Sequence, residues 1–156
     1  MQTHSLSLDV LCDEKYCLVG IHTTLEDYKL AYLLNKHLGT HFYKSKEDLN
    51  VEILNKITTF SLFNYSHIKY DFEWFLLANS AKRENRAVLS QLLFTSETKT
   101  YLIPEKKKVD FFIKITGSVP YSFLVEIINK IKIIDQVITS YSIDKNTLKS
   151  KDFLIF

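Results

Sequence analysis

Glycine is scarce in this sequence, and its scarcity excludes one class of ligand site. Gly20, Gly39 and Gly117 are the only glycines among 156 residues. Loops that cradle phosphates, such as GxxxxGK(S/T) and GxGxxG, need several glycines within a few residues so that backbone N–H groups can approach the ligand. Neither pattern occurs, and neither does the GxSxG motif of a serine nucleophile. Nucleotide binding through these loops is therefore excluded.

Cysteine is nearly absent as well, and the histidines form no metal motif. Cys12 and Cys17 are the only cysteines, and their C-x4-C spacing has no second pair to complete a tetrahedral zinc site. None of the five histidines lies in an HExxH motif. We therefore expect no metal and no cofactor. Because the sequence carries no export signal, we expect both cysteines to be reduced.

Arginine is rare, which argues against a dedicated nucleic-acid binder. The formal net charge is only +2, and Arg83 and Arg86 are the only arginines. Arginine is favoured over lysine where guanine edges are read or phosphates are held in a bidentate fashion. Nucleic acid is therefore not an expected partner, and weak RNA binding through lysine-rich turns is a third hypothesis only.

Long hydrophobic runs are also missing. No apolar run approaches the roughly 20 residues that a membrane span requires. Residues 1–15 lack the basic and apolar regions of a signal peptide. These absences predict a cytoplasmic protein without a membrane partner.

The composition that remains is that of one globular domain. Hydrophobic residues make up 46% of the chain, charged residues 24% and aromatic residues 13%. This length suffices for one ordinary hydrophobic core without metal or disulfide support. We expect a single domain over residues 1–156, with a core rich in Phe and Tyr.

Two segments have the apolar spacing of amphipathic helices. The first spans residues 25–38, with a capping box at Thr23 and Glu26 and a stop at Gly39. The second runs to about Ile134, with Ser118 as its N-cap. Its apolar positions are Leu124, Ile127, Ile128 and Ile131, and Glu126 and Lys130 form an exposed pair.

The rest of the sequence favours β structure. Strands are predicted at residues 5–11, 16–22, 58–65, 70–78, 88–94, 99–103, 109–115 and 137–143. Residues 79–86 are predicted to form an exposed loop, and the state of residues 44–56 is left open. The predicted fold class is α+β, a mainly antiparallel twisted sheet with two principal helices packed on one face, similar in outline to ferredoxin-like arrangements.

Two polar residues fall beside the apolar stripe of the first helix. Asp27 and Asn35 could line a pocket between the helix and the sheet. Alternatively, Asp27 complements the helix dipole from the first turn, and Asn35 hydrogen-bonds an adjacent loop. The second interpretation is favoured, because buried polar groups are usually satisfied within the fold.

The most distinctive stretch is residues 101–112, with the sequence YLIPEKKKVDFF. Pro104 lacks a backbone donor and ends the strand before it, and the EKKK turn then reverses the chain into the next strand. Glu105 and Asp110 could act as paired carboxylates, but their spacing across a turn implies no shared burial. We favour a structural corner in which Asp110 pairs with a lysine of the turn or caps backbone N–H groups.

Residues 103–111, IPEKKKVDF, resemble the signature of the IPExxxVDY family of small bacterial proteins. Phe111 stands where the family has its final tyrosine, which removes any role that needs that hydroxyl. The resemblance extends over most of the chain. It implies a bacterial cytoplasmic protein and carries over no catalytic residue.

The C-terminal tail, residues 148–156, ends in four apolar residues. Phe153 and Phe156 could dock into a partner's groove or extend a partner's sheet. The alternative is that the tail covers the domain's own core, because exposed apolar ends reduce solubility. The second alternative is favoured.

Three functional hypotheses follow, none of them requiring catalysis. The leading one is a cytoplasmic protein-interaction or regulatory module that binds a protein partner through a sheet edge or the tail. The second is a small-ligand-binding or sensing domain in which Asp27 and Asn35 face an aromatic-lined pocket. The third is weak RNA binding, and the oligomeric state stays open.

Overall fold

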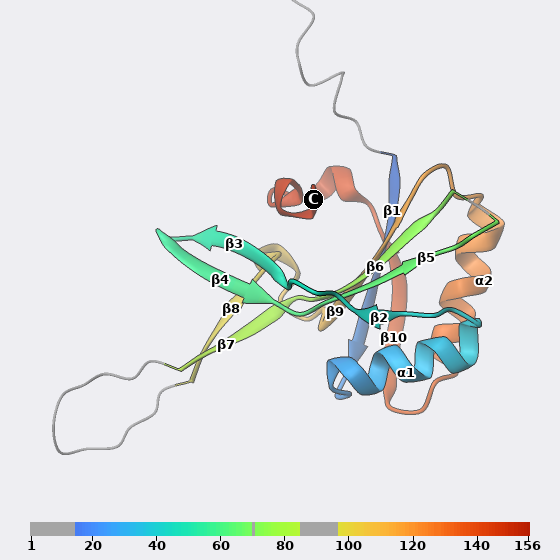
Figure 1. Cartoon of the computed structure of the whole chain (residues 1–156), viewed down its shortest axis with the longest axis horizontal. Coiled ribbons are helices and arrows are strands. Elements are labelled where there is room, and N and C mark those ends of the chain that lie inside the picture. Colours follow the sequence, from blue (N-terminus) through green and yellow to red (C-terminus); the bar gives the residue numbers. More distant parts are fainter. Residues whose placement is uncertain (1–14, 70, 85–96) are drawn as a thin grey trace, which may run out of the picture.

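The computed structural model describes residues 15–69, 71–84 and 97–156. Cys12 and the strands predicted at residues 5–11 and 88–94 lie outside these ranges. Six strands form one antiparallel sheet in the order β10-β1-β9-β6-β5-β2 (Figure 1). In chain order these strands are β1 (Tyr16–Thr23), β2 (Tyr43–Lys44), β5 (Leu62–Ser66), β6 (Glu73–Ala78), β9 (Phe111–Thr116) and β10 (Val137–Ile143).

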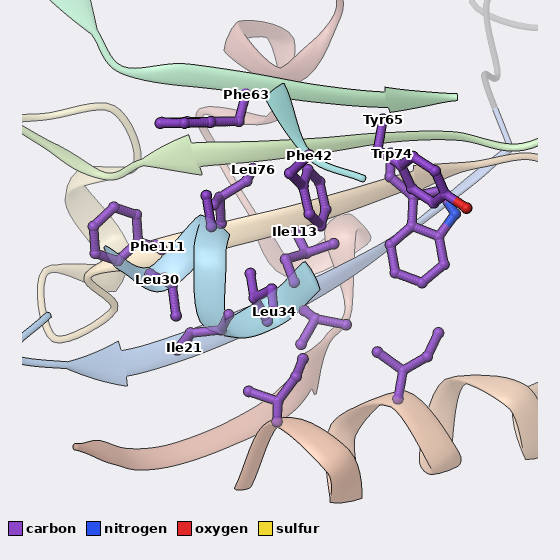
Figure 2. Close-up of a cluster of buried hydrophobic side chains, with 14 of the residues drawn as sticks. Ile21, Leu30, Leu34, Phe42, Phe63, Tyr65, Trp74, Leu76, Phe111 and Ile113 are labelled. Carbon is purple, nitrogen blue, oxygen red and sulfur yellow. The ribbon is translucent and has the colours of Figure 1, made fainter. Parts of the chain in front are cut away.

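Both helices cover the same face of this sheet. Helix α1 spans Asp27–Leu38 and helix α2 spans Tyr121–Lys132. Their apolar sides bury a cluster that includes Leu30 and Leu34 of α1, Ile113 of β9 and Trp74 of β6 (Figure 2). The predicted α+β class, with two helices on one face of an antiparallel sheet, is confirmed.

The opposite face carries a second core. It is covered by a hairpin of β3 (Leu49–Ile53) and β4 (Lys56–Phe60), by the IPEKKK turn, and by the C-terminal tail (Figure 1). The buried side chains of this core include Phe60, Phe112, Leu148 and Leu154. Burial of apolar side chains on both faces explains why the strands carry so many aromatic and branched residues.

Residues 44–56, left open by the sequence, contain most of that hairpin. Leu54 and Asn55 form its two-residue turn, since Ile53 pairs with Lys56. Both have positive φ, at 51° and 60°. A turn of this kind matches the right-handed twist of the flanking strands. Asn tolerates this backbone region, whereas Leu rarely adopts it, which is why the sequence pattern did not reveal the turn.

Each helix connects two strands that run parallel but are not neighbours in the sheet. Strands β9 and β10 flank β1 and are both antiparallel to it, and α2 connects them. The predicted order of strand, helix and strand over residues 109–143 is confirmed. The same order is repeated by β1, α1 and β2.

The starts of both helices differ from the prediction. The N-cap of α1 is Glu26, and that of α2 is Pro120; neither makes a side-chain capping hydrogen bond. Thr23 instead accepts a hydrogen bond from the Leu25 N–H and donates one to the Gln136 carbonyl, which ties β1 to the start of β10. The predicted capping box and the Ser118 N-cap are therefore wrong.

The strand pairing corrects two predictions, one of a strand and one of a loop. The strand predicted at residues 58–65 is broken at Ser61, because β4 pairs only with β3 whereas β5 enters the main sheet. The predicted exposed loop at residues 79–86 instead contains strand β7 (Ser80–Glu84), which pairs with β8 (Glu97–Tyr101). Asn79, placed in that loop by its polarity, has no exposed surface.

Candidate functional site

A cavity of about 520 Å³ opens where both helices meet one end of the sheet. Its walls come from the end of α1, the facing ends of β5 and β6, and one side of α2 from Phe123 to Lys130. Five aromatic rings line it: Tyr65, His67, Phe72, Trp74 and Phe123. The volume lies within the range of about 300–1,000 Å³ that is usual for small-molecule pockets.

The rings meet at steep angles. The centroids of Tyr65 and Trp74 are 5.9 Å apart with an angle of 63° between the ring planes. Those of Trp74 and Phe123 are 6.2 Å apart at 86°, and those of Tyr65 and His67 are 6.1 Å apart at 76°. Edge-to-face contacts of this kind stabilise aromatic pairs beyond the area they bury. The walls of the cavity are therefore mutually supported.

The aromatic residues differ in depth. Trp74 is 5% exposed and belongs to the core, whereas Phe123 is 37% exposed and stands at the opening. Tyr65 is buried beside Trp74 in the same aromatic cluster (Figure 2), and desolvation by burial raises the pKa of its hydroxyl. The deep part of the cavity is accordingly apolar, and its opening is accessible to solvent.

The polar groups stand mainly at the opening. Lys130 Nζ lies 2.8 Å from Glu126 Oε1, one helical turn apart on α2, so the predicted pair is confirmed. His67 Nδ1 accepts a hydrogen bond from the Lys69 N–H, which places the proton of the neutral ring on Nε2. These groups can meet the polar end of a ligand whose apolar part enters among the rings.

Gly39 and Asn35 shape the wall that α1 contributes. Gly39 adopts a left-handed conformation with φ 68° and ends the helix, as predicted. The Asn35 side chain then holds the returning chain: its Oδ1 accepts from Thr40 Oγ1 and the Phe42 N–H, and its Nδ2 donates to the Phe42 carbonyl. Asn35 therefore hydrogen-bonds the adjacent loop, as the favoured interpretation expected, and is absent from the cavity lining.

Asp27 is also occupied within the fold. Its carboxylate accepts hydrogen bonds from the Tyr28 N–H and from Ser61 Oγ, at the point where β4 gives way to β5. Asp27 does not line the cavity either. The structure thus contains an aromatic pocket, but Asp27 and Asn35 do not face it; both are hydrogen-bonded within the fold, as the favoured interpretation expected.

Gly117 brings Phe72 to the cavity. Its φ is 99°, a conformation that favours glycine, and a Cβ atom there would lie 2.8 Å from Phe72 Cδ1. The chain after β9 can therefore pass directly over the Phe72 ring. No other residue type would allow this approach without displacing the ring.

Glu105 and Asp110 are anchored at separate places. The Glu105 carboxylate accepts hydrogen bonds from the N–H (2.7 Å) and the Oγ (3.1 Å) of Ser150 in the tail. Partial burial raises the pKa of Glu105, but the hydrogen bonds to its carboxylate outweigh burial and leave the pKa below its ordinary value. Asp110 Oδ2 accepts from the Thr23 N–H at 2.9 Å. Asp110 thus caps a backbone N–H, which is one of the two roles that the corner interpretation offered, whereas the contact of Glu105 with the tail was not predicted.

Asn79 connects these parts and was missed by sequence reasoning. Its Nδ2 donates to the carbonyls of Lys106 and Val109, and its Oδ1 accepts from the Ile103 N–H. One side chain therefore satisfies three backbone groups of the IPEKKKV turn. A single polar residue before a polar run carries no signal for this role.

The tail packs its apolar residues against the domain itself. The Phe156 ring lies 5.1 Å from that of Phe75, and Phe153 is partly buried in the second core. Lys114 has no exposed surface; its Nζ donates to the Leu154 carbonyl and lies 4.5 Å from the centroid of Phe156. The sequence placed Lys114 on the expected face of β9 but did not reveal its burial.

Cys17 is partly buried on the helix-covered side of the sheet. Desolvation by burial raises the pKa of its thiol, and the opposing effects of the Lys145 charge and the Val119 backbone are smaller. The protonated thiol is a poor nucleophile, so Cys17 is not suited to covalent chemistry.

These features define an α+β domain with one aromatic cavity at the end of its sheet. No family model, no curated protein and no solved structure matches the chain. Within residues 15–69, 71–84 and 97–156, no helix is long and apolar enough to cross a membrane. In the same ranges, no three His, Cys, Asp or Glu side chains are grouped so that they could hold a metal ion.

Proposed function

We propose that this protein is a non-catalytic binding domain for a small molecule that carries a planar apolar ring. The observation that supports the proposal is the cavity among Tyr65, Trp74 and Phe123, whose rings already contact one another. A binding site that exists before the ligand arrives loses less conformational entropy on binding. The ring of the ligand lies against these side chains.

The opening determines which end of the ligand stays outside. Glu126 and Lys130 are the charged side chains among the described lining residues, and they already neutralise each other. Both are about half exposed, at 59% and 46%, so their attraction is screened and either can turn toward a ligand. A molecule with one apolar ring and one polar or charged substituent matches this arrangement.

The same geometry offers little for catalysis. The charged groups stand at the solvent-accessible opening, whereas the deep part of the cavity is lined by Trp74, Tyr65 and Ile127. The hydroxyl of Thr40, which is buried, already donates to Asn35 Oδ1. A general acid or base acts on a reacting group held within hydrogen-bonding reach in a site from which water is excluded. Binding and release of the ligand, rather than its conversion, is the function we propose.

The protein-interaction hypothesis stays a prediction. If a partner binds the tail, it can contact only Ile155 and Phe156, whose exposed fractions are 51% and 41%, because Leu148 and Leu154 are buried in the domain's own core. Membership of the IPExxxVDY family, and with it a bacterial cytoplasmic setting, is likewise a proposal. It is supported only by the resemblance of the sequence, which the IPEKKKVDF stretch carries most distinctly.

A thermal-shift screen with a matched pair of variants tests the proposal. Phe123 and Tyr121 both stand on α2, but only Phe123 lines the cavity, and Tyr121 is 78% exposed. The wild-type protein is screened against acidic, basic and neutral metabolites that contain a ring. At about 100 times Kd, a ligand adds about 2.7 kcal/mol of stability, which for a domain of this size raises Tm by about 5–10 °C.

The two variants then assign any hit to the cavity. Phe123→Ala should weaken the hit by about tenfold, because one aromatic wall is removed, whereas Tyr121→Ala should leave its affinity unchanged. Equal effects of both truncations would contradict the proposal. So would the absence of any stabilising compound in a broad ring-containing set.

A further inference from the structure

A second concave surface lies on the IPEKKK turn, at the other end of β9 from the aromatic cavity. It encloses about 410 Å³ and is lined by residues 104–109 of the turn, His22 of β1 and Tyr141 of β10. The turn precedes Phe111, the first residue of β9, whereas Ser118 of the aromatic cavity follows the end of that strand. The two surfaces therefore share no lining residue.

The base of this surface holds two hydrogen-bonding side chains. His22 Nε2 lies 2.9 Å from the Tyr141 hydroxyl, and the two ring centroids are 5.4 Å apart. Both residues are half-buried on adjacent strands. Each is held by the other. When His22 Nε2 donates to the Tyr141 oxygen, the tyrosine hydroxyl keeps its own hydrogen for an additional acceptor, at a position that is already fixed.

The charge around this base is concentrated and positive. Lys106, Lys107 and Lys108 all line it, whereas Glu105 is the only carboxylate among its described lining residues. The Glu105 oxygens accept hydrogen bonds from Ser150. Three lysines and one hydrogen-bonded carboxylate give this surface an excess of positive charge, which is large for a chain whose net charge is only +2.

The lysines stand on a rigid turn. The Lys106 N–H donates to the Ile103 carbonyl, the Val109 N–H donates to the Lys106 carbonyl, and Asn79 binds the same turn from below. Val109 and Ile103 are buried on either side of the lysines. The backbone that carries the lysines is thus fixed, which lowers the entropy that the backbone loses when they bind a common anion. Lys107 Nζ lies 5.8 Å from the centroid of the Tyr101 ring and must turn from it to join the other two.

We propose that this surface binds the phosphate group of a small phosphorylated molecule. A phosphate carries up to two negative charges and several acceptor oxygens, so it can meet lysine ammonium groups and the His22–Tyr141 pair together. The lining holds no arginine, so the lysines would bind the phosphate as point charges rather than in a bidentate fashion. This site does not depend on the ligand proposed for the aromatic cavity.

Pyrophosphate serves as the probe, followed by calorimetry and by two-dimensional NMR of the full chain. The test variant is Lys106→Gln, Lys107→Gln and Lys108→Gln combined. The control is Lys36→Gln, Lys46→Gln and Lys56→Gln combined, which removes the same charge at exposed positions elsewhere. Tyr141→Phe removes only the hydroxyl at the base. Urea denaturation establishes that each variant is folded.

We expect saturable binding that shifts the backbone resonances of residues 103–109 and weakens as salt is added. The turn variant should bind at least about tenfold more weakly, Tyr141→Phe about threefold or more, and the charge control less than about twofold. If the turn variant fails to fold, the Tyr141→Phe variant tests the site by itself. An unchanged affinity of Tyr141→Phe for pyrophosphate would then overturn the proposal.

Three other results would also overturn it. These are equal weakening in both lysine variants, no saturable binding at pyrophosphate concentrations up to about 10 mM, and resonance shifts that map to the aromatic cavity instead. A single-stranded RNA oligonucleotide that binds through the same lysines more tightly than pyrophosphate would assign the surface to a polymer and refute the small-molecule proposal.

Discussion

Replacement of Asn79 by alanine should be among the most destabilising substitutions of a polar residue in this protein. The side chain has no exposed surface and makes three hydrogen bonds, of 2.8–2.9 Å, to the backbone of Ile103, Lys106 and Val109. Alanine would leave the Ile103 N–H and the Val109 carbonyl without these partners, whereas the Lys106 carbonyl still accepts a hydrogen bond from the Val109 N–H.

The expected magnitude follows from those two groups. Each buried backbone group that loses its partner costs about 1–3 kcal/mol, and partial entry of water reduces the sum. We therefore expect Asn79→Ala to lower the free energy of unfolding by about 2–4 kcal/mol, a large part of the about 5–15 kcal/mol typical of a domain. The backbone bonds Asn79 N–H to Asp110 and Leu102 N–H to Asn79 remain.

Equilibrium urea denaturation measures this change directly. Trp74 is the only tryptophan and is buried, so its fluorescence reports on unfolding of the main sheet. Asn50→Ala is the matched control, because Asn50 is exposed and accepts one hydrogen bond, from Thr59 Oγ1. That control should cost less than about 0.5 kcal/mol. A loss below about 1 kcal/mol for Asn79→Ala would refute the role assigned to Asn79.

Asn79→Asp separates the donor role from the acceptor role. The aspartate keeps an acceptor for the Ile103 N–H but turns a carboxylate oxygen toward the carbonyls of Lys106 and Val109. Placing a buried charge beside two acceptors should cost at least as much as alanine at neutral pH. If aspartate is tolerated, the two donor bonds are not important to the turn.

Three further predictions concern the anchors around the two surfaces. The pKa of Glu105 is lowered on folding, so its ionised form stabilises the protein above the ordinary carboxyl pKa of 4.5, and this stabilisation is lost as pH falls through the folded pKa. In Glu105→Gln, the urea concentration at the unfolding midpoint should therefore fall less steeply with decreasing pH than in the wild-type protein. Deletion of residues 152–156 removes the fully buried Leu154 and should cost about 2–5 kcal/mol in the same assay, so retention of full stability would return the tail to a docking role. Gly117→Ala combines a φ of 99° with a Cβ 2.8 Å from Phe72 and should cost about 2 kcal/mol, whereas an unchanged Tm would show that the ring yields freely.

Local patterns were sufficient to predict the elements whose faces are uniform. In α2, Leu124, Ile127 and Ile131 repeat with the helical period and all are buried. In β9, Phe111, Ile113 and Ile115 alternate and all belong to the core under the helices. Such segments are predictable because each residue's burial follows from its own element, whatever that element packs against.

Features that depend on distant partners were not predictable. The predicted strand breaks at Ser61 because the residues before it pair with β3 and the residues after it pair with β6 in the main sheet. Asn79 is buried because its side-chain amide hydrogen-bonds a turn that includes Ile103, 24 residues away in the sequence. Lys114 is buried because the tail returns over it. The aromatic cavity was unpredictable for the same reason. Tyr65, Trp74 and Phe123 come from three different elements, and the local sequence does not indicate how these elements are aligned with one another.

The most direct test of the proposed function is an NMR titration that follows Trp74. Its indole N–H gives the only such signal from this chain, so the signal is assigned without further work. Titration with the compound that raises Tm most in the screen should shift this signal in a saturable way, with the same Kd as calorimetry, and Phe123→Ala should weaken that Kd by about tenfold. A compound that stabilises the protein while the Trp74 signal stays in place would bind elsewhere and would contradict a ligand site in the aromatic cavity.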